Sequence, residues 1–369
     1  MLRTAIADLD RSALRHNLAR ARAAAPGASV FATIKSAGYG HGLMLAAEAF
    51  ADHSEGFGVA CTGEGIALRE AGYREHRICV LNGPVDAEEL AECAAHGLEP
   101  LIHQAWQLDA LGSLEGEDRL RVWLKIDSGM GRIGVPPDTA AVWHDWLSRC
   151  RAVAGPVGLM THMSCADDRG DDYTNGQWET FTAACRGLEG ERSAANSACV
   201  LGWPTAHADW IRPGIMLYGC SPFVEGAEPA LDLRPAMTLR TRLIAINRLR
   251  AGAAIGYGRA WHCPEDMPVG VAAIGYGDGY PRHAPNGTPV LVGGRRVPMV
   301  GRVSMDKITL DLRTAPDATV GDEVVLWGAG LPIEEIADAS GTIGYELMCG
   351  VHGRVATRLV GHAGISVTL

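Results

Sequence analysis

Lysine is rare in this sequence, and its few positions are the first candidates for chemistry. The chain has 369 residues and 33 basic side chains, but lysine occurs only at Lys35, Lys125 and Lys307. A lysine amine can lose its proton and attack a carbonyl carbon, whereas an arginine guanidinium keeps its proton in proteins. A lysine retained among so many arginines is therefore a candidate for chemistry that requires a titratable primary amine.

Lys35 has the most informative surroundings of the three. It follows the apolar run VFATI at 30–34 and precedes SAGYGHG at 36–42, in which three of the seven residues are glycine. Glycine allows the backbone to approach a ligand closely. A half-buried lysine at such a loop can form a Schiff base with a carbonyl compound. The alternative is an ordinary surface lysine at a strand end, which the scarcity of lysine makes the weaker interpretation.

The elements that would position this lysine form a repeating pattern between about residues 28 and 220. Eight apolar, strand-like runs occur at 29–35, 56–60, 77–83, 98–103, 119–127, 157–163, 192–196 and 210–219. Helical patterns such as those at 63–72, 86–97 and 172–188 separate them. Single helices between short strands indicate parallel pairing through right-handed crossovers. We therefore predict a (β/α)8 TIM barrel rather than an open, doubly wound sheet, with active-site residues just after the strands.

The pattern changes after Pro222. Strand-length runs separated by glycine and proline dominate the rest of the chain, and only 333–339 and 345–351 look helical. These features predict an all-β second domain. The strand-like segment 3–10 is a candidate to cross to that domain. The predicted division is a barrel at 8–225 and a C-terminal β domain that consists of residues 226–369 together with residues 1–7.

The composition excludes several classes of protein. Hydrophobic residues make up 47% of the chain and charged residues 21%, which is typical of a globular protein with a large core. The net charge of −10 disfavours nucleic acid as a partner, because such binding depends on a cationic surface. No apolar run approaches the roughly 18 residues of a membrane span, and the charged start is unlike a secretion signal. We therefore expect no membrane association and a cytoplasmic location.

Ten cysteines are scattered along the chain, and no two of them form a C-x-x-C pair. This spacing indicates neither a zinc ribbon nor a disulfide scaffold. We expect reduced thiols that are buried in the core, and no bound metal.

The segment FATIKSAGYGHG at 31–42 resembles the cofactor-attachment segment of the alanine racemases, which are pyridoxal-phosphate enzymes of fold type III. Further blocks similar to this family follow in order and cover both domains. They are KIDSGMGRIGV at 125–135, MTHMSCADD at 160–168, AANSAC at 194–199, WIRPGIMLYG at 210–219, GYGRAW at 256–261, AIGYGDGYPR at 273–282, VGRVSMDKITLD at 300–311 and GYELMCG at 344–350. The resemblance implies that the barrel binds pyridoxal 5'-phosphate and that the chain interconverts L-alanine and D-alanine.

The resemblance also implies catalytic roles. Lys35 would hold the cofactor as an aldimine and transfer a proton on the D face of the substrate, and Tyr257 would serve the L face. Racemisation requires two such groups on opposite sides of a planar carbanion. Arg212 would donate to the pyridine nitrogen, and His162 would link Arg212 to the tyrosine. Without the resemblance, Tyr257 would be interpreted as a strand tyrosine and His162 as a core histidine.

Binding roles follow from the same resemblance. It assigns the cofactor phosphate to Tyr39, Ser197, Gly214, Ile215 and Tyr345, and we add Asn196 from its residue type. Arg132 would contact the phenolic oxygen of the cofactor and the substrate carboxylate, to which the backbone N–H of Met305 would also donate. Lys125, inside an apolar strand, would be carbamylated, while Lys307 is expected on the surface.

In this family the tyrosine and the methionine reach the cofactor from a second subunit. The resemblance therefore implies a homodimer in which Tyr257 and Met305 of one copy complete the site around Lys35 of the other. An amino-acid racemase of broader specificity, which also accepts serine, is an alternative interpretation. A fold-related decarboxylase would place an acid where Arg212 stands, and a non-catalytic pyridoxal-phosphate carrier would lack the second domain. The role could be cell-wall precursor synthesis or D-alanine catabolism.

Overall fold

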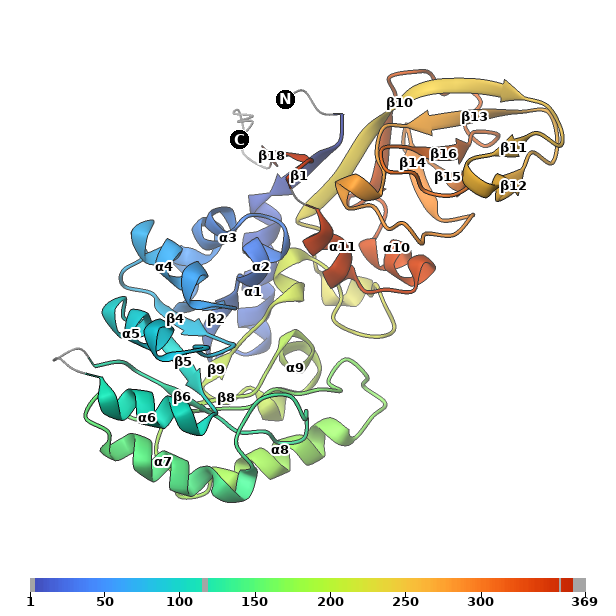
Figure 1. Ribbon diagram of the computed structural model, residues 1–369. Coiled ribbons are helices and arrows are strands. Elements are labelled where there is room, and N and C mark those ends of the chain that lie inside the picture. Colours follow the sequence, from blue (N-terminus) through green and yellow to red (C-terminus); the bar gives the residue numbers. More distant parts are fainter. Residues whose placement is uncertain (1–3, 115–118, 352, 361–369) are drawn as a thin grey trace.

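The N-terminal part of the chain forms a closed barrel of eight parallel strands, as predicted (Figure 1). The structure is a computed structural model that describes residues 4–114, 119–351 and 353–360. The barrel strands are β2 (Ser29–Thr33), β3 (Gly56–Val59), β4 (Arg77–Val80), β5 (Glu99–Ile102), β6 (Trp123–Lys125), β7 (Gly158–Met160), β8 (Arg192–Ser193) and β9 (Trp210–Ile211). Parallel pairing of β2 with β9 closes the barrel.

Several barrel strands are shorter than the apolar runs that predicted them. The run at 210–219 is a strand only as far as Ile211, because Pro213 has no N–H to donate to a neighbouring strand. Its remainder forms the short 3-10 helix η4 (Ile215–Tyr218). Likewise the run at 192–196 ends early, since Asn196 caps the helix α9 (Ser197–Gly202) by accepting a hydrogen bond from the backbone N–H of Cys199. These early ends free the following residues to line the mouth of the barrel.

Helices surround the barrel on its outside. They are α1 (Arg11–Ala24), α3 (Leu43–Phe50), α4 (Thr62–Glu70), α5 (Ala87–Ala95), α6 (Ala105–Ser113), α7 (Ala140–Arg149) and α8 (Tyr173–Ala184), besides α9. The helical patterns predicted at 63–72, 86–97 and 172–188 correspond to α4, α5 and α8. Local sequence explains two starts, because the carboxylates of Asp10 and Asp86 accept backbone N–H bonds in the first turns of α1 and α5.

A charged and aromatic cluster fills the barrel at the start of its strands. The guanidinium of Arg77 lies 4.4 Å from the ring centroid of Trp210 and forms a double hydrogen bond with the buried Glu99. The indole N–H of Trp123 donates to the same carboxylate at 2.9 Å. This end of the barrel is therefore closed, and the cavity described below opens at the opposite end.

The C-terminal domain is built around an eight-stranded sheet in the order β13-β16-β15-β14-β17-β10-β1-β18. Its strands are β10 (Met237–Leu249), β13 (Met267–Ala272), β14 (Pro289–Val292), β15 (Arg295–Val300), β16 (Ile308–Asp311), β17 (Glu323–Trp327) and β18 (Ala356–Val360), with β1 (Ile6–Asp10). A small hairpin, β11 (Ala254–Ile255) and β12 (Trp261–His262), forms a separate two-stranded sheet. The two predicted helices, α10 (Ile333–Ser340) and α11 (Gly344–Gly350), lie between this sheet and the barrel (Figure 1).

The N-terminal strand crosses to the C-terminal domain, as predicted. β1 pairs antiparallel with β10 and parallel with β18 before the chain enters α1. A buried ion pair joins β1 to β10, because Asp8 accepts hydrogen bonds from the guanidinium of Arg240. The division of the chain at 8–225 and 226–369 with 1–7 stays a prediction, and its outermost segments, 1–3 and 361–369, lie outside the described residues.

The expectation of buried cysteines is correct for six thiols and wrong for others. All ten thiols are free. Cys61, the N-cap residue of α4, and Cys349, in α11, are exposed, and Cys150 and Cys165 are half-buried. Within the parts of the chain that the structure describes, no helix is both long and apolar enough to cross a membrane.

Candidate active site

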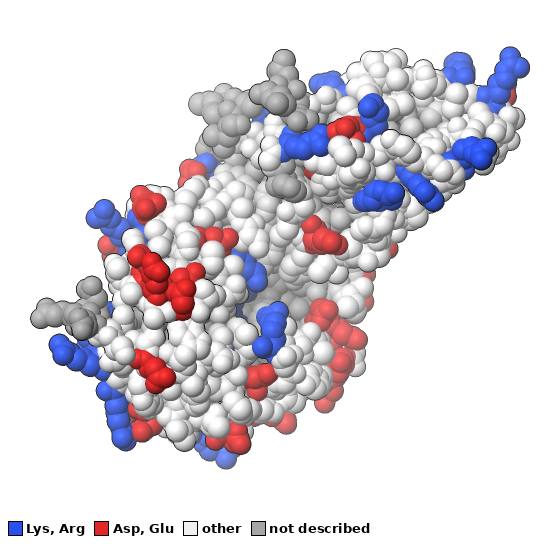
Figure 2. Space-filling model, viewed as in Figure 1, with Lys and Arg blue, Asp and Glu red and all other residues white. Residues whose placement is uncertain are grey.

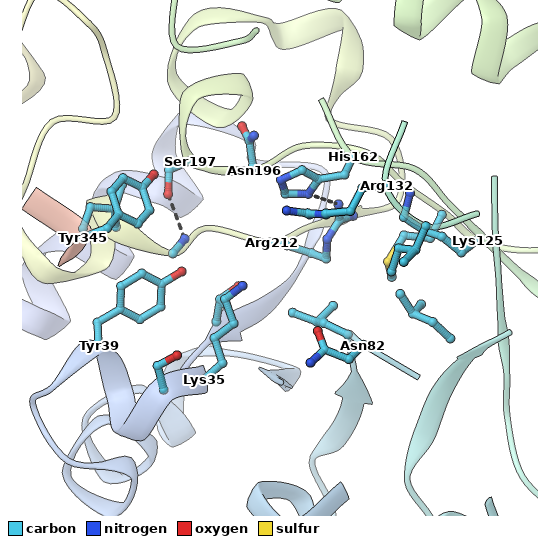
Figure 3. Close-up of a pocket in the computed structure, with 18 of the residues that line it drawn as sticks. Lys35, Tyr39, Asn82, Lys125, Arg132, His162, Asn196, Ser197, Arg212 and Tyr345 are labelled. Carbon is cyan, nitrogen blue, oxygen red and sulfur yellow. Dashed lines mark hydrogen bonds between the residues drawn. The ribbon is translucent and has the colours of Figure 1, made fainter. Parts of the chain in front are cut away.

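A cavity of about 520 Å³ opens at the carboxyl ends of the barrel strands, where residues just after the strands were predicted to gather (Figure 3). Its walls include most of the predicted site residues: Lys35, Tyr39, Lys125, Arg132, His162, Asn196, Ser197, Arg212, Gly214, Ile215 and Tyr345. Tyr257 and Met305 are not among its walls. Both lie in the C-terminal domain, with 71% and 52% of their surfaces exposed. Lys307 is exposed, as predicted.

An unusual backbone turn presents Lys35 to the cavity. Lys35 begins the short element α2 (Lys35–Tyr39), in which Ser36, Ala37, Gly38 and Tyr39 all have φ between 51° and 63°. Each non-glycine residue in this left-handed region costs about 1–2 kcal/mol. Gly40, at φ 78°, closes the turn, and a Cβ there would lie only 2.1 Å from the carbonyl oxygen of Met348 in α11. The turn therefore packs directly on the C-terminal domain.

The amine of Lys35 lies in a strongly cationic environment. Burial is the main cause that lowers its pKa, and the nearby charge of Arg132 lowers the pKa further. A lower pKa increases the fraction of neutral amine, which is the form that attacks a carbonyl group or accepts a proton. The chemistry inferred from the sequence is thus available at this position.

Arg212 is fixed beneath the cavity by several acceptors. It is only 5% exposed, and its guanidinium donates to the hydroxyl of Ser193, to the carbonyl of Thr161 at 2.7 Å and to the carbonyl of Ala194 at 3.3 Å. The guanidinium also lies 3.4 Å from Nδ1 of His162 (Figure 3). Because a guanidinium has no acceptor atom, Nδ1 must accept this hydrogen bond.

The charge of Arg212 also controls its neighbour. Burial lowers the pKa of His162 well below its usual range, and the Arg212 charge lowers it further, so this histidine is neutral near pH 7. Burial lowers the pKa of Arg212 itself to about 10, which still leaves it protonated near neutral pH. The pair therefore offers a fixed donor and a neutral imidazole.

Lys125 is the second lysine of the cavity and is 4% exposed. Burial, with a contribution from the charge of Arg212, lowers its pKa to about 7. Its amine donates to the carbonyl of Ile126 at 3.3 Å. The lowered pKa increases the fraction of neutral amine near pH 7.

One end of the cavity is built to receive an anion. The hydroxyl oxygen of Ser197 accepts hydrogen bonds from the backbone N–H groups of Gly214, at 2.8 Å, and Met216, at 3.3 Å. Its own hydrogen is then left for an acceptor inside the cavity. The hydroxyl of Thr33 is buried and has no partner within the described chain. A Cβ on Gly214 would lie 2.4 Å from Oη of Tyr39, so only glycine leaves this space open.

The phenols at the same end are neutral donors. Burial raises the pKa of Tyr39 and of Tyr345 above their usual range. The Tyr39 ring stacks on Tyr218 with centroids 4.6 Å apart, which fixes the direction of its hydroxyl. Asn196 lines the cavity, but both ends of its amide are engaged, one with Cys199 and the other with the carbonyl of Met163.

The charge of the cavity wall has one sign. Lys35, Lys125, Arg132 and Arg212 are basic, and the described residues of the wall include no carboxylate. By contrast, the outer surface of the barrel carries several acidic patches, and basic side chains are visible in the hollow below the second domain (Figure 2). The cavity therefore favours a ligand with phosphate and carboxylate groups.

Sequence reasoning missed several residues of the wall. Asn82 comes just after β4 and points into the cavity (Figure 3), so the rule that places site residues after barrel strands could have found it. Cys349 lines the cavity from α11, and no local signal distinguishes it from the buried thiols. The remaining additions are Thr33, Ser36, Leu81, Leu101, Ile133 and Met160.

Comparison with known proteins matches both parts of this chain to one family. The family model described as alanine racemase, N-terminal domain, matches residues 9–222, and the one described as alanine racemase, C-terminal domain, matches residues 236–359. An alanine racemase of Halorhodospira halophila is 53% identical over 355 residues, which are 96% of this chain and 97% of that protein. One of Nitrosococcus oceani is 53% identical over 348 residues, which are 94% of this chain and 97% of that protein.

Solved structures give the same result. The biosynthetic alanine racemase of Pseudomonas aeruginosa has a TM-score of 0.94 and 43% identity, covering 97% of this chain and all of that one. An alanine racemase of Bacillus anthracis, solved with bound L-Ala-P, has a TM-score of 0.87 at 28% identity, covering all of this chain and 98% of that one. With matches that span both domains, this chain belongs to the alanine racemase family, which depends on pyridoxal phosphate.

Proposed function

We propose that this protein interconverts L-alanine and D-alanine with pyridoxal 5'-phosphate as its cofactor. The observation that carries the proposal is the cationic cavity, with Lys35 just after the first barrel strand and Arg212 locked below it. The similar proteins described above are alanine racemases over nearly their full length. The residues of the cavity and the similarity to alanine racemases thus favour the same activity.

The residues of the cavity fit this cofactor. Its aldehyde would meet the amine of Lys35, and its pyridine nitrogen would meet the fixed guanidinium of Arg212. The phosphate would meet the free hydroxyl hydrogens of Ser197 and Thr33 and the phenols of Tyr39 and Tyr345. The N–H of Ile215, at the first position of η4, has no partner within its own helix and can donate to the same phosphate. When bound, the cofactor supplies an electron sink that acidifies the Cα–H of the amino acid.

Lys35 and Tyr257 would transfer the protons. An amine with a lowered pKa can take a proton from Cα on one face of the substrate, and a phenol can return one on the other face. Tyr257 does not reach the cavity of its own chain, since it is exposed on η6 (Tyr257–Arg259) of the C-terminal domain. We therefore propose a homodimer in which Tyr257 of each copy completes the site of the other, as does Met305.

Arg212 favours racemisation over the alternatives. Because an arginine retains its proton, Arg212 would leave the ring nitrogen of the bound cofactor largely unprotonated, and the cofactor would then supply a weaker electron sink. A weaker sink would favour return of the proton to the substrate over side reactions. A decarboxylase built on this fold would be expected to have an acid at this position. A non-catalytic carrier would give no purpose to the second domain that bears Tyr257.

Arg132 and Lys125 complete the proposed assignments. The guanidinium of Arg132 would bind the substrate carboxylate, for which its forked geometry is suited. Because burial lowers the pKa of Lys125 and so increases its neutral fraction, this amine can react with CO2, and we propose that it is carbamylated. The resulting anion would sit among cationic groups. A cytoplasmic location, and a role in cell-wall precursor synthesis or in D-alanine catabolism, remain parts of this proposal.

Two spectra of the purified protein test the proposal together. Absorbance should reveal a cofactor bound to an amine, and the circular dichroism of added L-alanine should decay to zero as the mixture becomes racemic. The same decay measured with L-serine compares the two substrates. Loss of CO2 or formation of pyruvate without racemisation would contradict the proposed activity.

A further inference from the structure

Arg132 enters the cavity from a loop without any anchor for its charged group. Its side chain is exposed, and within the described chain its guanidinium has no hydrogen bond and no ion pair. By contrast, the guanidinium of Arg212 has four acceptors. Fixing the rotamers of an arginine side chain whose guanidinium has no partner costs up to about 2 kcal/mol of conformational free energy on binding. The carbamate proposed on Lys125 would be close enough to attract this guanidinium, since the Arg132 charge acts on the Lys125 amine. In either state of Lys125, the backbone that carries Arg132 decides where its side chain starts.

The carboxylate of Asp127 organises that backbone. One of its oxygens accepts hydrogen bonds from the N–H groups of Gly129, at 3.0 Å, Met130, at 2.9 Å, and Gly131, at 3.1 Å. The other oxygen accepts a second bond from Gly131 at 3.0 Å. These three consecutive donors lie immediately before Arg132. Burial alone would raise the pKa of Asp127, but these donors outweigh it and hold the pKa below its usual range. The carboxylate thus binds the loop from inside in its charged form.

The base of the loop is also closed at Asp127. Its backbone N–H donates to the carbonyl of Val135 at 3.0 Å, and the N–H of Val135 donates to the carbonyl of Lys125 at 2.8 Å. Gly134 has a φ of 138°, and a Cβ there would lie 2.5 Å from the nitrogen of Asp127. Residues 127–135 therefore form a closed loop. Within this loop, the Asp127 carboxylate is the only charged group that accepts hydrogen bonds from the loop backbone.

Ile133, the residue after Arg132, packs against a buried cluster of the barrel. Two side-chain hydrogen bonds also join the loop to the barrel, both in the first half of the loop. The hydroxyl of Tyr173 donates to the carbonyl of Gly129 at 2.8 Å, and the hydroxyl of Ser128 lies 2.7 Å from that of Thr161. Thr161 also holds Arg212 through its carbonyl. These contacts fix the first half of the loop on the barrel, and the Asp127 carboxylate extends that order to Gly131.

We propose that Asp127 is the positioning residue of Arg132, and that through this loop it sets the affinity of the site for the substrate carboxylate. The inference rests on the proposed function of Arg132. Removing the carboxylate leaves three backbone donors without their acceptor, so the loop can leave its present path. Arg132 must then be ordered at the moment of binding, which weakens substrate binding more than it slows the proton transfers.

The test compares Asp127→Asn and Asp127→Ala with the normal holoenzyme. Asparagine keeps one acceptor oxygen and loses the charge, whereas alanine loses every bond. KM for alanine should rise by about threefold in Asp127→Asn and by about tenfold or more in Asp127→Ala, with a smaller change in kcat. Asp322→Asn is the matched control, because the Asp322 carboxylate also accepts a backbone N–H, from Thr319 at 2.8 Å, in a turn of the other domain. This control should leave KM unchanged.

Arg132→Gln separates the inference from the function on which it rests. If Asp127 acts through Arg132, Asp127→Ala should add little to KM in an Arg132→Gln background. Fully additive effects would overturn the inference while leaving the role of Arg132 intact. An Arg132→Gln enzyme with normal KM would instead contradict the proposed role of Arg132 in binding substrate.

Proteolysis provides a readout that does not depend on activity. Trypsin cleaves after arginine, so a loosened loop should expose the bond between Arg132 and Ile133. Holoenzyme with Asp127→Ala should yield fragments beginning at Ile133 at least about tenfold faster than the normal holoenzyme or Asp322→Asn, because cleavage follows local opening. Unchanged cleavage together with an unchanged KM would refute the positioning role. A general loss of fold would instead speed cleavage at arginines throughout the chain.

Discussion

The hydroxyl of Ser197 and the backbone N–H of Gly214 form a 2.8 Å hydrogen bond in which the serine oxygen is the acceptor. The bond joins the start of α9 to the turn after β9, two elements that share the anion-binding end of the cavity. Since Met216 donates to the same oxygen, the hydroxyl hydrogen is directed away from both donors. One side chain therefore both shapes the cradle and contributes a donor to it.

Ser197→Ala should weaken binding of the cofactor. The substitution removes one donor to the phosphate and leaves the N–H groups of Gly214 and Met216 without an acceptor, at a cost of about 1–3 kcal/mol for a buried group. We expect the dissociation constant of pyridoxal phosphate to rise by about tenfold, measured by absorbance after equilibrium dialysis. Ser113→Ala, on the exposed face of α6, is the control and should bind the cofactor normally.

Lys35→Ala should abolish covalent attachment of the cofactor. The expected result is loss of the absorbance band of the bound cofactor and a fall in racemase activity of at least about 10²–10⁴-fold, the usual contribution of a proton-transfer group. Lys307→Ala removes another lysine that is exposed in the second domain, and it should retain the band and the activity. A Lys35→Ala protein that still carries cofactor through an amine linkage would disprove the assignment.

Tyr257→Phe should inactivate the protein through the partner's site. Mixed dimers of Tyr257→Phe with Lys35→Ala contain one site with both normal groups, so mixing two inactive proteins should restore up to about a quarter of the activity if subunits exchange randomly. Tyr73→Phe, which removes a phenol from the barrel away from the cavity, serves as the control. No recovery in mixtures shown to exchange subunits would contradict a shared site.

Lys125 should make stability depend on pH in a defined window. Its pKa is about 7 in the folded chain and 10.5 as the ordinary value, so between these limits the unfolded chain binds more protons. The free energy of unfolding should therefore rise with pH, by up to about 1.4 kcal/mol per unit from about pH 7 to pH 10, and Lys125→Met should lack this contribution. Urea unfolding of both proteins, freed of cofactor and CO2, measures the difference.

The difference in the free energy of unfolding between the normal chain and Lys125→Met should grow as the pH falls toward 7 and level off below pH 7. A difference that stays constant across the window would mean that Lys125 is not perturbed by burial. In buffer with dissolved bicarbonate, intact mass should show one CO2 adduct on the normal chain and none on Lys125→Met. Absence of the adduct from both would remove carbamylation from the proposed function.

The framework of the site could be predicted from the sequence because barrel strands and their order leave local signals. Lys35 follows a run of apolar residues, so the amino-acid pattern alone places it at the mouth of the barrel. Arg212 lies inside the apolar run at 210–219, so its role in the site was implied by the resemblance, and the structure ends this strand at Ile211. The left-handed turn at 36–39 could not be predicted. It depends on contacts with distant residues, such as the close approach of Gly40 to Met348.

The other features of the site that the sequence did not predict also depend on contacts between distant parts of the chain. Cys349 reaches the cavity from the other domain, and only the three-dimensional arrangement brings it beside Lys35. Asn196 was chosen for its polar side chain, but the amide caps α9, a use decided by where β8 ends. Tyr257 and Met305 lie apart from the cavity of their own chain, so their roles were suggested by resemblance and cannot be derived from one copy.

The pairing of β1 with β18 has a consequence for biosynthesis. Ile6 lies opposite Ala356, so β1 acquires this neighbour only after the barrel and the other described strands of the C-terminal domain have been made. The barrel, from α1 to β9, contains all of its own strands and can become compact earlier. The edge of β1 that pairs with β18 must therefore stay unpaired until β18 has been made. Deletion of β18 would leave this edge open to pairing with other nascent chains.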